Sequence, residues 1–207
     1  MNRYKQGAFF SDEFVGENSW NGYERKCLFA NAGNGRFIDV ARPTGTDEIK
    51  DGRGVAIADF DGDGRLDLVI NNNNSTPTIY LNRHRTAGNW VELKLDGTRS
   101  NRDAIGARVR LRIPGKTMTR QVEAGSGYAS EAMLPVHFGL GQATQIEALE
   151  IFWPSGLRQR FEGASLDGLI NHRLHVEEGR DQIDQLTATR PPARAIIAPR
   201  HSGEGSR

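Results

Sequence analysis

The sequence is organised around one acidic stretch, Asp59-Phe60-Asp61-Gly62-Asp63-Gly64-Arg65-Leu66-Asp67. At neutral pH, four carboxylates in so short a loop repel one another strongly, and a bound hard cation removes that repulsion. Ca²⁺ suits such a loop best because it accepts roughly 6–8 oxygen ligands in tolerant geometry, whereas Mg²⁺ demands a stricter octahedron. Gly62 and Gly64 permit the left-handed backbone that a loop needs to fold around an ion.

The predicted calcium ligands are the side-chain oxygens of Asp59, Asp61, Asp63 and Asp67, together with the backbone carbonyl of Arg65. The alternative is an Asp- and Gly-rich hairpin turn that holds no ion. A turn needs only one or two such residues, so four carboxylates favour the metal site.

The EF-hand, the other common calcium loop, does not fit this stretch. An EF-hand requires a bidentate Glu at its twelfth position and a helix on each side. Counted from Asp59, the twelfth residue is Ile70. The flanking residues 54–58 and 68–70 are short and rich in β-branched side chains, which predicts a strand, a loop and a second strand.

Composition limits the remaining classes. The 207 residues are 37% hydrophobic and include 24 glycines, a mixture typical of short strands joined by many turns. A net charge of +1 gives no global field for nucleic acid or an anionic membrane. The single cysteine, Cys27, excludes an internal disulfide and is expected to be a small buried hydrophobe. No apolar run is long enough to span a membrane, and residues 1–6 lack the apolar core of a secretory signal.

Residues 1–86 predict short strands and turns. A hairpin is expected from residues 28–31 and 36–40, joined by the turn at residues 32–35. Residues 79–83 echo residues 27–31 about fifty positions earlier, as in a blade-type β-repeat.

Residues 88–178 predict an antiparallel sheet or sandwich, because apolar residues alternate with polar ones along several segments. The clearest case is residues 107–113, where Arg108, Arg110 and Arg112 alternate with apolar side chains. Residues 179–207 mix Pro, Arg, Gly and Ser, which predicts a disordered tail.

Two sets of motifs carry a family resemblance. Residues 31–37, 52–56 and 59–67 resemble the FG-GAP/VCBS repeat of integrin-type β-propellers. Residues 100–109, 125–128, 137–141 and 153–156 resemble the ASPIC/UnbV domain. In this order the pair resembles the cartilage-acidic-protein-like family. The resemblance implies a calcium-binding propeller followed by an all-β domain in an extracytoplasmic protein, with calcium ligation at the four aspartates and no established catalytic residues.

A propeller closes with roughly 4–8 blades, and residues 1–86 hold only one or two. We therefore expect an incomplete propeller, with further blades supplied by a longer chain or a partner, and a longer chain would also account for the missing signal. The predicted architecture is all-β: partial propeller blades in residues 1–86, an antiparallel sandwich-like domain in residues 88–178 and a tail in residues 179–207.

Enzymatic chemistry finds little support in the sequence. The residues around Gly125-Ser126-Gly127 fail the G-x-S-x-G spacing, and His172 and His175, three apart on a strand, cannot share a metal. The predicted function is a non-enzymatic, calcium-binding module for binding or adhesion, extracellular or periplasmic, with an unidentified protein or glycan ligand.

Two alternatives remain open. The face of Arg108, Arg110 and Arg112 is either a polyanion-binding surface or a solvated sheet face neutralised by Glu92, Glu123 and Glu150. The UnbV name by itself suggests an accessory component of a biosynthetic pathway.

Overall fold

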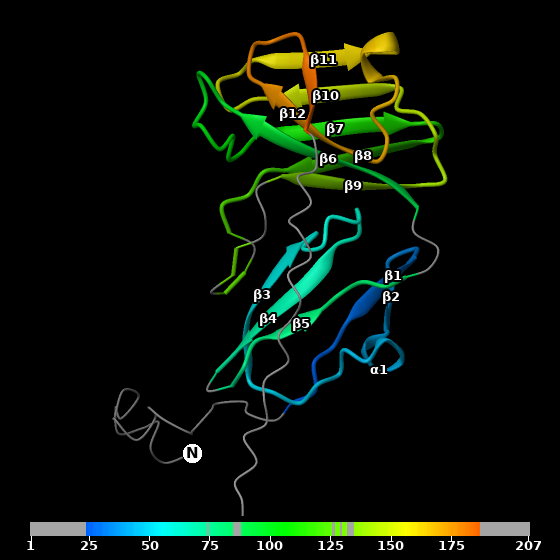
Figure 1. Ribbon diagram of the computed structural model, residues 1–207, viewed down its shortest axis with the longest axis vertical. Helices are drawn as coiled ribbons and strands as arrows, with labels where there is room; N and C mark the ends of the chain where they lie inside the picture. The colour runs from blue at the N-terminus through cyan, green and yellow to red at the C-terminus, as the bar shows by residue number, and fades with distance from the viewer. Residues whose placement is uncertain are drawn as a thin grey trace, which may run out of the picture.

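The computed structural model describes residues 24–73, 75–84, 88–125, 127–128, 130–131 and 135–186. Figure 1 shows two bodies of β-structure stacked along the long axis. The N-terminal region (residues 24–84) holds β1 to β5, and the C-terminal sandwich (residues 88–186) holds β6 to β13. The prediction of an all-β chain is confirmed.

The N-terminal region contains two antiparallel units and one short helical turn. The strands β1 (Phe29–Gly33) and β2 (Arg36–Asp39) form the predicted hairpin. After the single turn α1 (Ala41–Thr44), the strands β3 (Gly52–Ala58), β4 (Asp67–Asn72) and β5 (Thr78–Tyr80) form one sheet in that order. The described residues therefore supply partial blades and do not close a propeller.

Large apolar side chains remain exposed across this region. Four of them are close to 60% exposed: Phe29 at 60%, Phe37 at 63%, Ile38 at 58% and Ile79 at 61%. Cys27 is exposed as well, so the prediction of a buried cysteine is wrong. The physical reason is that the partial blades have too few layers to cover both faces of their sheets.

The C-terminal sandwich is made of two four-stranded sheets, ordered β11-β10-β7-β8 and β13-β12-β6-β9. Its elements are β6 (Asn89–Asp96), β7 (Arg108–Ile113), β8 (Lys116–Gln121), β9 (Val136–Gly141), β10 (Ala148–Phe152), β11 (Arg158–Glu162), the 3₁₀ turn η3 (Gly163–Leu166), β12 (His172–Glu177) and β13 (Ile183–Leu186).

One hydrophobic core joins the two sheets of the sandwich. Alternate residues of each strand point inward, and Leu93, Leu111, Phe138, Ile151 and Leu174 are at most 1% exposed. The predicted alternation is confirmed. Pairing is antiparallel except between β6 and β12, which run parallel.

The prediction of a disordered tail from residue 179 is wrong for residues 183–186. Residues 183–186 form β13, which pairs antiparallel with β12 at the edge of the sheet. Backbone hydrogen bonds to β12 order this segment although it contributes few apolar side chains. The rest of the predicted tail, residues 187–207, lies outside the described residues.

A buried carboxylate fastens two loops of the sandwich. Glu178, 3% exposed, accepts hydrogen bonds from the N–H groups of Thr98, Arg99 and Ser100 at 2.7–2.8 Å. It also accepts from the hydroxyls of Ser100 and Ser155. Burial raises the pKa of Glu178, but these donors outweigh it and hold the pKa at about 2. The two motifs around Ser100 and Ser155 are thus brought together by one side chain.

Among the described residues, no helix is long and apolar enough to cross a membrane.

Candidate metal centre

The acidic loop (residues 59–67) connects β3 to β4, as the strand–loop–strand pattern predicts. Gly62 and Gly64 take positive φ angles of 76° and 86°. Both values lie in the left-handed region that glycine adopts without strain. The predicted role of the two glycines in turning this loop is confirmed.

Three of the four predicted carboxylates converge. Oxygen atoms of Asp59, Asp61 and Asp67 lie within 4.8 Å of one another. The side chains of Asp59 and Asp67 are buried, whereas that of Asp61 is 29% exposed. Carboxylate oxygens converging in a glycine-rich loop are the hard ligands that Ca²⁺ prefers, so the donor set fits the predicted ion.

Backbone groups hold the two buried carboxylates in place. Asp59 accepts from the N–H groups of Gly62, Asp63 and Gly64 at 2.7–3.0 Å. Asp67 accepts from the N–H of Phe60 at 3.0 Å and from that of Asn82 at 2.7 Å. The loop is therefore shaped by its own carboxylates, and a residue that follows β5 helps to orient one of them.

Asp63, the fourth predicted carboxylate, contacts arginine side chains and is not part of the cluster. Asp63 pairs with the guanidinium of Arg65 and lies 3.6 Å from that of Arg83, outside the three-carboxylate cluster. Arg65 donates its N–H to Asp63 at 2.9 Å and its Nε–H to the carbonyl of Asn82 at 2.7 Å. Ligation by Asp63 and by the Arg65 carbonyl stays a prediction.

The acidic loop rests on the outer face of the sandwich. Strand register aligns His137 on β9, Glu92 on β6 and Arg173 on β12 in one row across that face. We call this contact the joint. The sandwich contributes the row and Trp90 to the joint, and the N-terminal region contributes the acidic loop. The joint brings together residues more than seventy positions apart in the sequence.

Gly64 makes the closest approach in the joint. A Cβ atom on Gly64 would lie 1.9 Å from Nε1 of Trp90, so only glycine fits there. The carbonyl of Gly64 accepts a hydrogen bond from Nε2–H of His137 at 2.9 Å, and the His137 ring stacks on Trp90. Burial lowers the pKa of His137, and the bond to the Gly64 carbonyl partly offsets this.

Arg173 bridges two carboxylates in the joint. Its Nη2 lies 3.0 Å from Oδ2 of Asp59, and its Nε lies 3.3 Å from Oε1 of Glu92. Burial raises the pKa of Glu92, although the Arg173 charge opposes that rise. Glu92 is only 7% exposed and faces the acidic loop, so the expectation that it neutralises the arginine face is wrong.

The sequence did not predict that Trp90, Glu92, His137 and Arg173 lie beside the acidic loop. Each occupies a polar or aromatic position in an alternating strand, where the pattern predicts exposure to water. The one available signal was the large indole of Trp90 at an outward position. His172 and His175 contact the Ile170 carbonyl and Asp96 respectively and hold no common site.

Comparison with known proteins gives two family matches. Residues 12–70 match the FG-GAP-like repeat, and residues 97–183 match the ASPIC and UnbV family. Cartilage acidic protein 1 of Xenopus tropicalis is 32% identical over 146 residues, 68% of this chain and 22% of that protein. The Mus musculus protein of the same name is 31% identical over 144 residues, with the same two shares. The chain thus spans about a fifth of the length of these relatives.

Proposed function

The chain carries an FG-GAP-like repeat followed by an ASPIC and UnbV domain, and on that premise we propose that it is a calcium-binding, non-enzymatic module for binding or adhesion. It acts outside the cytoplasm, in the extracellular space or periplasm, as part of a larger propeller-containing assembly. The observation that carries the proposal is the convergence of Asp59, Asp61 and Asp67 within 4.8 Å.

Calcium has a structural role in this proposal. The ion offsets the repulsion among the loop carboxylates and so stiffens the turn between β3 and β4. No bidentate Glu closes the site, so the dissociation constant is expected to be on the order of 10⁻⁴–10⁻³ M, the range of extracellular modules. At about 10 mM Ca²⁺ such a site stabilises the fold by roughly 1.4–2.7 kcal/mol.

Asp61→Ala tests the proposal because Asp61 is the most exposed of the three clustered carboxylates and its loss leaves the buried hydrogen bonds of the loop intact. We expect the variant to lose the rise in melting temperature that millimolar Ca²⁺ gives the wild type, and to melt close to the wild type in EDTA. Asp103→Ala, at an exposed position in another loop, is the matched control and should keep the calcium response. Equal shifts with and without calcium would refute the metal role.

The uncovered apolar surface supports the larger assembly. Phe29, Phe37, Ile38 and Ile79 are large apolar side chains that are each at least 58% exposed, and exposed apolar surface gathered in one region is typical of an interaction site. Further blades, from a longer chain or from a partner, would cover it. Light scattering with a hydrophobic dye is the measurement: a stable monomer that binds no dye would contradict this part of the proposal.

A further inference from the structure

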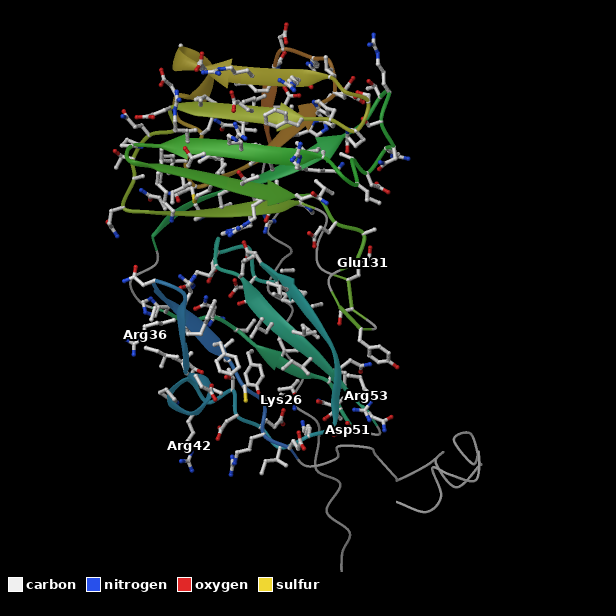
Figure 2. The ribbon with its side chains drawn as sticks, turned by 180° about the vertical axis from the view of Figure 1, so that it is seen from behind. Lys26, Arg36, Arg42, Asp51, Arg53 and Glu131 are labelled. Atoms are coloured by element: carbon white, nitrogen blue, oxygen red, sulfur yellow. The ribbon has the colours of Figure 1, made fainter. Side chains whose placement is uncertain are left out.

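The outer face of the β11-β10-β7-β8 sheet has an ordered charge pattern. Register across β7, β10 and β11 sorts its outward side chains into three rows. The first row is Arg108, Phe152 and Arg158; the second is Arg110, Glu150 and Arg160; the third is Arg112, Ala148 and Glu162. Figure 2 shows many nitrogen-tipped side chains over this part of the sandwich.

The positive charge of this face is concentrated at one end. In the third row Arg112 is balanced by Glu147 at 3.1 Å and by Glu162 at 3.8 Å. In the second row Arg110 and Arg160 share Glu150, at 3.6 and 2.8 Å. In the first row, no described carboxylate forms an ion pair with either arginine. Of the glutamates predicted to neutralise the arginine face, Glu150 pairs with Arg110. Arg112 is balanced instead by Glu147 and Glu162, and the Arg108 end has no described carboxylate partner.

Three guanidinium groups gather around one aromatic ring at the uncompensated end. The Cζ atoms of Arg108, Arg110 and Arg158 lie 5.8, 5.3 and 5.5 Å from the ring centroid of Phe152. The ring quadrupole attracts each cation, but the cations repel one another. An anion placed among them would relieve that repulsion. All three side chains are exposed, and of the three only Arg110 has a described carboxylate partner, Glu150 at 3.6 Å.

From this geometry we propose that the row of Arg108, Phe152 and Arg158, with Arg110 beside it, is a binding surface for a sulfated polysaccharide. Guanidinium groups bind tetrahedral oxyanions through paired N–H donors, so each arginine can take a sulfate group. The two flanking arginines stand on strands separated by β10, about 10 Å apart, a separation that suits sulfates on neighbouring sugars.

A nucleic acid fits this surface less well. Single-stranded nucleic acids follow a continuous basic groove in which successive bases stack on aromatic rings. Here the cationic strip is one row with Arg110 beside it, it holds one aromatic ring, and the carboxylate of Glu150 lies in the next row. This surface does not involve the acidic loop, so the proposal stands apart from calcium binding.

The test measures the affinity of the whole chain for a fluorescent heparin octasaccharide by anisotropy, at about 0.15 M ionic strength and in EDTA. Replacing both flanking arginines, Arg108→Gln with Arg158→Gln, should weaken binding about tenfold, since two exposed ion pairs are lost. The matched control, Arg112→Gln with Arg42→Gln, removes the same charge from the balanced row and from α1, which lies far from the sandwich in Figure 2. We expect less than a twofold change for the control.

Three results would overturn the proposal. The first is the absence of heparin binding by the wild type, and the second is an equal loss in the two double variants, which would mean that only net charge matters. The third is tighter binding of a thymidine oligonucleotide than of heparin. If the double variant does not fold, Arg158→Gln on the edge strand β11 carries the same test, with Arg112→Gln as its control, and an unchanged affinity there would also refute the surface.

Discussion

Replacing Glu178 by Gln tests the claim that one buried carboxylate holds the two motif loops of the sandwich together. Gln keeps the shape of the side chain, and its carbonyl oxygen can still accept from the backbone N–H groups of residues 98–100. What it loses is the negative charge to which those N–H groups and the hydroxyls of Ser100 and Ser155 donate.

The size of the effect follows from the pKa of Glu178. The carboxyl titrates at about 2 in the folded chain, against an ordinary value of 4.5. At roughly 1.4 kcal/mol per pH unit between those two values, ionised Glu178 stabilises the fold at neutral pH by an upper limit of about 3 kcal/mol. Because the folded pKa is the lower one, this stabilisation is fully present above pH 4.5 and is lost as the pH falls toward 2.

The assay is urea denaturation followed by far-ultraviolet circular dichroism at a series of pH values from 7 downward. Wild type and Glu178→Gln should differ by about 2–3 kcal/mol at pH 7, and the gap should close as the pH approaches 2. Glu123→Gln is the matched control because Glu123 is exposed and has the same charge. A gap that stays constant with pH would show that the loss comes from packing and not from the charge, and would refute the reasoning.

Three further predictions concern the joint and the core. Gly64→Ala should destabilise the chain by about 1–3 kcal/mol more than Gly62→Ala, because both positions have positive φ but only a Cβ at residue 64 meets Trp90; equal melting temperatures would contradict the contact. Arg173→Gln leaves two buried carboxylates without their cation and should cost about 3–5 kcal/mol, a loss that millimolar Ca²⁺ should partly restore in thermal melts. Ile151→Ala should cost about 2–5 kcal/mol through a core cavity yet leave the calcium affinity measured by titration calorimetry unchanged.

The features that the sequence predicts correctly depend on residues close together in the chain. The left-handed glycines of the acidic loop, the hairpin of β1 and β2 and the alternation along β7 each rest on a few adjacent residues. Local conformation and side-chain alternation determine these three features, and long-range strand pairing has little effect on them.

The features that the sequence could not predict depend on strand pairing. Arg173 reaches the acidic loop only because β12 pairs with β6 in parallel and places it beside Glu92. Glu178 has no local mark that distinguishes it from its neighbour Glu177, and its importance appears only when residues 98–100 and Ser155 meet around it. The strand β13 is set by hydrogen bonds to β12, which a composition rich in polar residues does not reveal.

The two outer faces of the sandwich show why alternation alone did not identify the covered face. Both faces consist mainly of polar residues alternating with core residues, but their charges differ in arrangement. A face can be buried at small cost only when its charges find partners, and the row of His137, Glu92 and Arg173 offers a neutral ring and an ion pair. The row of Arg108 and Arg158 has two cations without carboxylate partners, so it stays exposed to water.

In the joint, one cation, Arg173, pairs with two carboxylates, Glu92 and Asp59, which leaves an excess of negative charge beside the acidic loop. That excess is the electrostatic reason to expect that a cation in the loop strengthens the joint as well as the turn.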